Sequence, residues 1–286
     1  MKLLSRFKKR LSYSRIKAIN FFHSVLNSRL SNQYLFILSP PFSGSTLLNE
    51  IIDRSESVSC NNPYGTKEGQ FLPEIKPLLW NEDNFNPDLD VDWDYIKKVW
   101  SKYWNLSKPV LLEKSPSNLV RAKSIEKHFE GVHFVCLVRD PYALVEGFLR
   151  RSIIYKTPKD AAGFVIKCFK HQKDNLECLH YNLLVKYEDI VESSEDAVKR
   201  LVEFVPALHP ISTEGEFEAH NIKGEASGIH NFNLEKVERL NQAQLDEINS
   251  VFDQHAELIQ YFGYSVYSSR AELLDCIFTE RPPNNN

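Results

Sequence analysis

The sequence predicts an α/β fold with a central, mostly parallel sheet flanked by helices. Short apolar runs closed by turn residues alternate with segments of helical periodicity, which is typical of parallel βαβ units. The first apolar run, residues 34–38, passes through a loop of small residues directly into an apolar-periodic segment. With 286 residues, 42% of them hydrophobic, the chain is long enough for one large domain of this class.

The expected elements follow in chain order. Strands are predicted at residues 34–38, 109–116, 133–141 and 181–189, and helices at 46–54, from 141 to about 151, at 193–205 and as a pair near 234–262. Residues 55–94 are rich in Asn, Pro and acidic residues, so we expect long loops with short helices that form one wall of a substrate cleft. Trp80, Trp93, Trp100 and Trp104 are expected mostly in the core, with one available to stack on an acceptor ring.

We expect three parts: a basic helical extension at 1–32, the α/β domain at 33–265 and a C-terminal tail at 266–286. Residues 1–49 hold eight Lys or Arg and no acidic residue, which leaves the remainder at a charge of −11. An acidic body argues against nucleic-acid binding. The extension fits either a solvated helix or a peripheral membrane contact, because Leu3, Leu4, Phe7 and Leu11 recur at helical spacing among basic residues.

No secretory or membrane-spanning pattern is evident in the sequence. The five cysteines are scattered without CxxC spacing, and their odd number, with Cys136 inside an apolar strand, predicts reduced thiols in a cytoplasmic setting. The nine histidines form no HExxH pattern and no cluster with cysteine, so we expect no metal site.

The loop after the first strand, "SPPFSGSTLL", has the features of an anion site. A strand–loop–helix unit directs backbone N–H groups and the positive end of a helix dipole at its guest. Gly44 allows close approach of the backbone, and Ser43, Ser45 and Thr46 add hydroxyl groups. The glycine and lysine that define a nucleoside triphosphate loop are missing, which disfavours ATP or GTP. The alternative is a tight turn with a serine at the helix N-cap.

Arg139 stands where the strand at 133–141 ends, at the sheet edge where open parallel sheets bind ligands. An arginine there can hold a phosphate through paired hydrogen bonds. The alternatives are a surface ion pair with Asp140, or Asp140 as a metal ligand.

Four segments in this order, "SPPFSGSTLL", "EKSP", "VRDPYALVEG" and "VKYEDI", resemble the sulfotransferases that use 3′-phosphoadenosine 5′-phosphosulfate (PAPS). The similarity covers about residues 33–265 and extends to bacterial carbohydrate-type and tyrosylprotein-type enzymes. It implies a P-loop-type three-layer α/β fold. It also implies transfer of a sulfuryl group from PAPS to a hydroxyl of a carbohydrate, lipid or other small molecule. Oligomeric state is not indicated.

The resemblance also implies site residues. The first loop would hold the 5′-phosphosulfate and Arg139 the 3′-phosphate, with Tyr187 close to the cofactor and Lys223 and Gly224 in a loop that closes over the 3′-phosphate. The cofactor-binding set is Pro41, Phe42, Ser43, Gly44, Ser45, Thr46, Arg139, Gly147, Tyr187, Lys223 and Gly224.

Two positions depart from the family pattern. Phe42 stands where the family usually has Arg or Lys, and Gly147 where it often has Ser. A catalytically impaired PAPS-binding homologue is therefore the main alternative, and a P-loop kinase a more distant one.

We expect Lys114 of "EKSP" to replace the missing cation, because tyrosylprotein-type enzymes carry a catalytic lysine there; the alternative is a surface lysine. Glu68 is the expected general base, with Glu74 and Glu113 as competitors.

Overall fold

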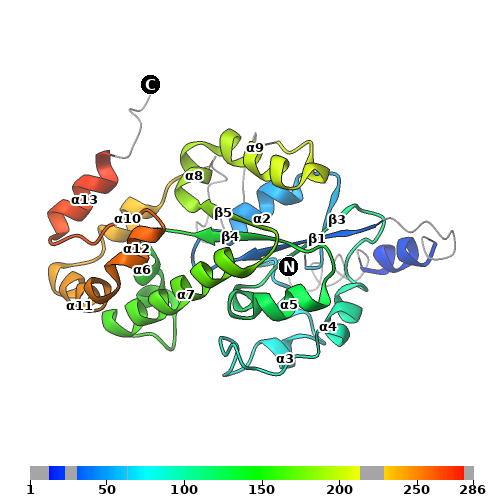
Figure 1. Ribbon diagram of the computed structural model, residues 1–286, viewed down its shortest axis with the longest axis horizontal. Helices are drawn as coiled ribbons and strands as arrows, with labels where there is room; N and C mark the ends of the chain where they lie inside the picture. The colour runs from blue at the N-terminus through cyan, green and yellow to red at the C-terminus, as the bar shows by residue number, and fades with distance from the viewer. Residues whose placement is uncertain (1–12, 23–30, 63, 213–228, 280–286) are drawn as a thin grey trace, which may run out of the picture.

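The computed structural model describes residues 13–22, 31–62, 64–212 and 229–279. Its centre is a parallel sheet in the order β2-β3-β1-β4-β5 (Figure 1). The strands are β1 (Gln33–Leu38), β2 (Val58–Cys60), β3 (Val110–Lys114), β4 (His133–Val138) and β5 (Asn182–Lys186). The predicted α/β fold with a parallel sheet is confirmed. Four strands coincide with the predicted runs, and β2 lies in the segment that we expected as loops and short helices.

The chain order places a topological switch point beside β1. From β1 the chain crosses to β2 and β3 on one side, and then passes to β4 and β5 on the other. In open parallel sheets, ligands bind in the crevice outside the carboxyl ends of the strands at such a point. Because all pairs are parallel, the residues that follow β1, β3, β4 and β5 meet at this one edge.

Helices cover both faces of the sheet. The element bounds are α2 (Ser45–Asp53), α3 (Lys76–Leu79), α4 (Trp93–Trp100), α5 (Ala122–His128), α6 (Pro141–Arg151), α7 (Pro158–Cys178), α8 (Tyr187–Glu192), α9 (Ser194–Phe204), α10 (Asn233–Val237), α11 (Gln242–Phe252), α12 (Ala256–Tyr261) and α13 (Arg270–Thr279). Short 3-10 turns cover Gly69–Phe71, Pro116–Arg121, Pro206–Leu208 and Asp253–His255.

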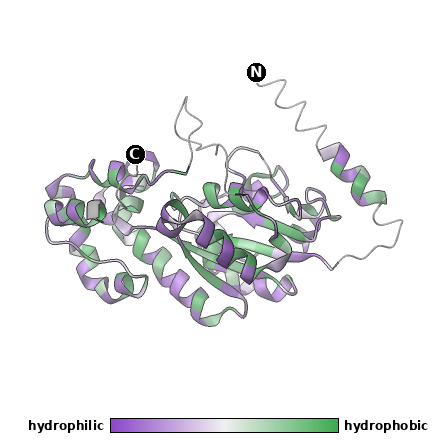
Figure 2. Ribbon diagram, turned by 90° about the horizontal axis from the view of Figure 1, so that it is seen from above, coloured by the Kyte–Doolittle hydropathy of each residue, from purple (hydrophilic) through white to green (hydrophobic). Residues whose placement is uncertain are grey.

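Side chains of successive strand residues point to opposite faces, which divides the core. Leu35 and Ile37 pack with residues of α2, α8 and α9, whereas Phe36 and Leu38 pack with residues of α3, α4 and α5. In Figure 2 the central strands are mostly in the hydrophobic colour and the surrounding helices carry both colours. Trp93, Trp100 and Trp104 are fully buried in the second cluster, while Trp80 is half-exposed beside Phe71.

A third cluster lies beyond the carboxyl edge of the sheet, where α6 and α7 pack with α11 and α12. Within residues 266–286, which we expected as a tail, α13 continues the fold. Its Leu273 is buried in this cluster, and Arg270 Nε donates to the carbonyl oxygen of Leu240 at 2.8 Å. Burial of one apolar face is the physical reason that this segment is helical rather than extended.

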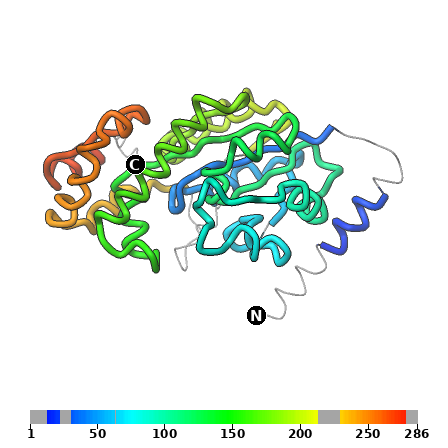
Figure 3. Tube along the Cα trace, turned by 60° about the horizontal axis from the view of Figure 1, so that its bottom comes forward, coloured from blue at the N-terminus to red at the C-terminus, as the bar shows by residue number. Residues whose placement is uncertain are grey.

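A helix at residues 13–22 lies at the opposite end of the molecule from α10–α13 (Figure 3). Asn20 Nδ2 donates to the carbonyl oxygens of Ser101 and Trp104 at 3.2 and 2.9 Å, which attaches this helix to the domain. The residues on which we based the membrane-surface alternative, 3–11, lie outside the described part of the chain. Among the described residues, no helix is long and apolar enough to span a membrane.

Candidate active site

The loop after β1 opens the site at the switch point. Phe42 and Gly44 have positive φ angles of 69° and 88°, and Gly44 is the N-cap of α2. Glycine adopts this left-handed conformation without strain. Among the described residues, no side chain caps α2, and the buried Ser43 hydroxyl has no hydrogen-bond partner. The start of α2 therefore presents backbone amides and an orphaned hydroxyl, which together suit an anion.

Tyr187 packs directly on this loop. It follows β5, and its ring lies so close to Gly44 that a Cβ there would be 2.4 Å from Tyr187 Cδ2. The Tyr187 hydroxyl donates to the His230 carbonyl oxygen at 3.0 Å and accepts from the Phe232 amide at 3.2 Å. Burial raises the pKa of Tyr187, so the phenol stays neutral near pH 7. Gly44 is thus required both by its φ angle and by the Tyr187 ring.

Arg139 connects β4 to the same loop. Its guanidinium carbon lies 3.8 Å from the centre of the Tyr187 ring, and Nη1 donates to the Phe42 carbonyl oxygen at 3.2 Å. Nε donates to Asn233 Oδ1 at 2.7 Å, while Nη2 is buried and has no partner in the described part of the chain. Asp140 accepts from the Ala143 amide at 2.7 Å and caps α6. The geometry therefore does not support the surface-pair alternative, since Arg139 is only 4% exposed.

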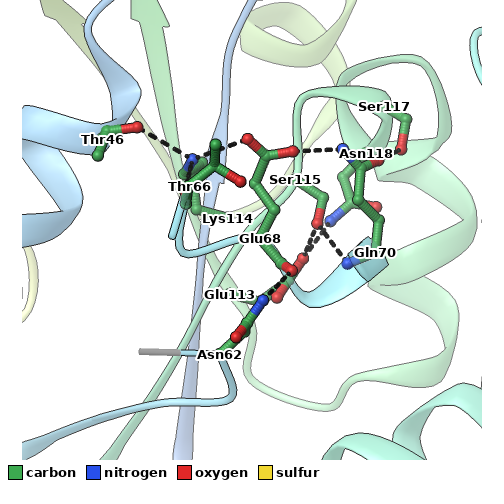
Figure 4. A network of polar contacts seen from close by, with 10 residues as sticks. All are labelled: Thr46, Asn62, Thr66, Glu68, Gln70, Glu113, Lys114, Ser115, Ser117 and Asn118. Atoms are coloured by element: carbon green, nitrogen blue, oxygen red, sulfur yellow. Dashed lines mark hydrogen bonds and ion pairs between the residues drawn. The ribbon is translucent and has the colours of Figure 1, made fainter. Parts of the chain in front are cut away.

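Lys114, at the end of β3, lies beside the first turn of α2 (Figure 4). Its Nζ is 3.4 Å from Thr46 Oγ1 and 3.3 Å from Glu68 Oε1, and it also donates to the Thr66 carbonyl oxygen. Only 1% of Lys114 is exposed, so it is not a surface lysine. Burial lowers its pKa, an effect that the charge of Glu68 partly offsets.

The three candidate bases occupy different environments. Glu68 contacts Lys114, and its Oε2 accepts from Gln70 Nε2. Glu113 is fully buried among donors that include Asn61 Nδ2 at 2.6 Å, and burial raises its pKa to about 7. Glu74 is exposed and accepts from the Tyr103 hydroxyl at 2.7 Å. Glu68 is the one of the three that touches the Lys114 ammonium group.

Phe42 and Gly147, the two departures, are neighbours. An ideal Cβ on Gly147 would lie 2.9 Å from Phe42 Cβ and 3.0 Å from Lys236 Nζ. The Phe42 ring packs on Phe148 with its centre 5.0 Å away, and the Arg151 guanidinium carbon is 5.8 Å from that centre. A side chain at position 147 is excluded as long as Phe42 and Lys236 keep these positions.

Most of the predicted site residues thus meet at one edge of the sheet: Pro41, Phe42, Ser43, Gly44, Ser45, Thr46, Glu68, Lys114, Arg139, Gly147 and Tyr187. Lys223 and Gly224 lie outside the described residues. Sequence reasoning did not find Asn233 and Lys236, both buried on α10. Their spacing of three residues, which puts two polar side chains on one helical face, was the available indication. Among the described residues, no cluster of His, Cys, Asp or Glu could hold a metal ion.

A parallel sheet with a glycine-containing strand–loop–helix at its switch point, ringed by buried donors, defines an α/β protein of the P-loop type. The model of the sulfotransferase family matches residues 34–206, more than half of the chain. The chain belongs to the sulfotransferase family. The predicted family resemblance is confirmed.

Individual relatives are distant. A "putative protein-tyrosine sulfotransferase" of Caenorhabditis briggsae is 21% identical over 273 residues, which cover 85% of this chain and 94% of the relative. The sulfotransferase domain from the curacin biosynthetic pathway is 19% identical with a TM-score of 0.42, covering 88% of this chain and 99% of that chain. Sulfotransferase STF9 from Mycobacterium avium is 12% identical with a TM-score of 0.48, over 89% and 84% of the two chains.

Proposed function

We propose that this chain transfers the sulfuryl group of PAPS to the hydroxyl group of an acceptor. The observation that carries this proposal is the position of the Lys114 ammonium, buried between Thr46 of the phosphate-type loop and the Glu68 carboxylate. A cation at the loop and a carboxylate next to it are the two groups that sulfuryl transfer to a hydroxyl needs. Membership of the sulfotransferase family supports the same reaction class.

The residues at the carboxyl edge fit a nucleotide with phosphates at both ends. Ser43 Oγ and Arg139 Nη2 are both buried and have no partner among the residues that the structure describes. A buried donor without a partner costs free energy unless a ligand satisfies it. Ser43, with the amides at the start of α2, would hold the 5′-phosphosulfate. Arg139 would hold the 3′-phosphate. Its Nε and Nη1 already donate to Asn233 and Phe42, so Nη2 is the atom of the guanidinium that would bind the ligand.

Lys114 is assigned to the leaving group. Sulfuryl transfer is expected to follow an in-line path with a loose transition state, by analogy with phosphoryl transfer. A sulfuryl group carries less negative charge than a phosphoryl group, so a protein cation suffices without Mg²⁺. Lys114 would neutralise the charge that develops on the bridging oxygen, which is the role that family members give to the cation at the position of Phe42. An anion beside Lys114 also favours the protonated form of this buried amine.

Glu68 is assigned to the acceptor. A general base must lie within hydrogen-bond reach of the proton that it removes. Glu68 would accept the proton of the acceptor hydroxyl. Its contact with Lys114 holds the carboxylate close to the cation assigned to the leaving group. Glu113 is less suited because its carboxylate is enclosed by Asn61, Ser115 and Asn118.

A transfer assay with radiolabelled PAPS and a panel of acceptors tests the proposal. The panel contains carbohydrates, lipids, phenols and tyrosine-containing peptides, the last because one relative is described as a protein-tyrosine sulfotransferase. Label transfer to any hydroxyl acceptor supports the function.

A second candidate function is a PAPS-binding homologue without catalytic activity, which the presence of Phe42 in place of the usual cation favours. That candidate predicts nucleotide binding without transfer. Preferential binding of ATP with Mg²⁺ would instead indicate a kinase.

A further inference from the structure

The space beside Gly147 is filled by a lysine from another element. Lys236 belongs to α10, and its Nζ lies 3.0 Å from the position of a Cβ on Gly147 in α6. Phe42 Cβ lies 2.9 Å from the same position. An amine thus lies directly beside the place where a side chain of residue 147 would begin. Phe42 links this place to Arg139, because its carbonyl oxygen accepts from Arg139 Nη1 at 3.2 Å.

Lys236 is a buried amine without a carboxylate hydrogen-bond partner among the described residues. Only 7% of it is exposed, and its Nζ donates to the Ala143 carbonyl oxygen at 2.9 Å. Burying an ammonium group without an ion pair is costly. Burial, followed by the positive charge of Arg139, lowers the pKa of Lys236 to about 6. A buried amine with a strongly lowered pKa at the edge of a binding site is characteristic of a functional group.

The charges around Lys236 are mostly positive. Arg139, Arg150 and Arg151 each disfavour its protonated form, and Glu146 is the one neighbouring acid that favours it. Glu146 Oε1 accepts from Arg150 Nε at 2.7 Å and from Arg239 Nη1 at 3.2 Å, whereas its Oε2 is buried with no hydrogen-bond partner among the described residues. Such a cluster of cations has more positive charge than the described residues neutralise, and an anion would relieve it.

α10 connects Lys236 to Arg139. Asn233, three residues before Lys236, accepts from Arg139 Nε at 2.7 Å and donates to Glu188 Oε1 at 2.6 Å. Residues three apart lie on the same face of a helix, so both side chains face the β4–α6 junction. On the other side of α10, Arg270 of α13 donates to the carbonyl oxygens of Glu238 and Leu240 and is not engaged with Lys236.

We propose that Lys236 binds the 3′-phosphate of the nucleotide together with Arg139, in place of the hydroxyl that the chain lacks at Gly147. This inference rests on the proposed function and assigns a further residue to its binding site. Phe42 and Gly147 then belong to one arrangement, since the missing side chain at 147 makes room both for Phe42 and for the amine. When the phosphate binds, Lys236 takes a proton from solvent and becomes the ammonium that pairs with it.

The test compares adenosine 3′,5′-bisphosphate with adenosine 5′-phosphate on the full chain by calorimetry. Lys236→Met removes the amine but keeps the length of the side chain. We expect it to weaken binding of the bisphosphate by about ten- to a hundredfold, the value of a charge-assisted hydrogen bond, and to leave adenosine 5′-phosphate unchanged. Lys173→Met, at a half-buried lysine of α7 that contacts Glu177 and Tyr261, is the control and should change neither.

A second measurement needs no variant. Near pH 7.5, calorimetry of the wild-type chain in buffers of different ionisation enthalpy counts the protons taken up on binding. We expect uptake approaching one proton with the bisphosphate and less with adenosine 5′-phosphate.

The outcomes separate the two proposals. Equal weakening of both nucleotides by Lys236→Met, unchanged binding of both, or no extra proton uptake with the bisphosphate would overturn the role of Lys236 and leave the proposed function in place. If the wild-type chain does not bind the bisphosphate at all, the proposed function itself fails.

Discussion

Arg139 donates a hydrogen bond from Nη1 to the carbonyl oxygen of Phe42 at 3.2 Å. This bond joins the residue that follows β4 to the loop that follows β1, on the two neighbouring strands at the switch point. Tyr187, after β5, lies against Arg139 and Gly44 and adds a third strand end to the contact. The two places that we assign to opposite ends of one nucleotide therefore belong to one packed unit rather than to separate surfaces.

Lys114→Met should abolish most turnover and leave nucleotide binding nearly intact. The variant removes the cation beside Thr46 but keeps a side chain of similar length in the buried space. If Lys114 acts mainly in the transition state, kcat should fall by about 10²–10³, as it does when one oxyanion donor is lost. Consumption of PAPS with an acceptor from the panel measures this, with Lys173→Met as control. Near-normal turnover would exclude Lys114 from catalysis.

Glu68→Gln should lower kcat while the affinity for adenosine 3′,5′-bisphosphate changes little. Loss of a general base costs about 10²–10⁴ in rate. Glu74→Gln is the matched control, because Glu74 is exposed, lies in the same segment and contacts Tyr103 rather than Lys114. A large loss of affinity with unchanged turnover is the opposite pattern and would remove Glu68 from this role.

Gly147→Ala should destabilise the protein, and by less when Phe42 is replaced, because Phe42 and Lys236 both lie close to the added Cβ. The added Cβ would lie 2.9 Å from Phe42 Cβ, and such overpacking typically costs about 1–3 kcal/mol. Phe42→Gly removes the obstructing atoms and suits the positive φ of 69° at that position. Urea unfolding of both single variants and the double variant gives the coupling energy. Gly163→Ala is the control, since no atom lies within 4 Å of its Cβ position. Additive effects at 42 and 147 would contradict the packing described here.

Lys236→Met should stabilise the ligand-free protein, and more so at pH 7 than at pH 10. The lysine pKa falls from 10.5 to about 6 on folding, so between these values the unfolded chain binds more protons. The free energy of unfolding contributed by this group therefore decreases as the pH falls through that window. Near pH 7 the amine is protonated in the unfolded chain and neutral in the folded protein, so its removal relieves the free-energy cost of losing that proton on folding. Urea unfolding at both pH values checks this. A variant that is less stable, or a difference independent of pH, would argue against a buried, destabilised amine.

The fold was largely predictable because four strands are continuous apolar runs closed by turn residues. β2 was not, since its three residues carry no pattern of their own and become a strand by pairing with β3. α7 was not predicted because polar residues interrupt its buried face: Gln172 and Asn175 are buried and bind the carbonyl oxygens of Leu38, Leu137 and Leu119. β2 and α7 both depend on hydrogen bonds to other parts of the fold, and the hydrophobic periodicity of a sequence does not predict such bonds.

The positions of the candidate residues were predictable where local sequence determines them, as in the loop at Gly44 and at strand ends such as Lys114 and Arg139. Lys236 was not predictable in this way. The role that we propose for Lys236 depends on the missing side chain at Gly147, about ninety residues away in the sequence. The packing of α10 on α6 brings these two residues together. Burial of a lysine cannot be read from a short, mixed segment such as "NLEKV".

Calorimetric titration of the full chain with adenosine 3′,5′-bisphosphate and with adenosine 5′-phosphate, for wild type and Arg139→Met, tests the central claim most directly. The account predicts that wild type prefers the bisphosphate and that Arg139→Met loses most of this preference, because the guanidinium that should hold the 3′-phosphate is gone. Equal affinity of wild type for the two nucleotides, or an unchanged preference in Arg139→Met, would contradict it.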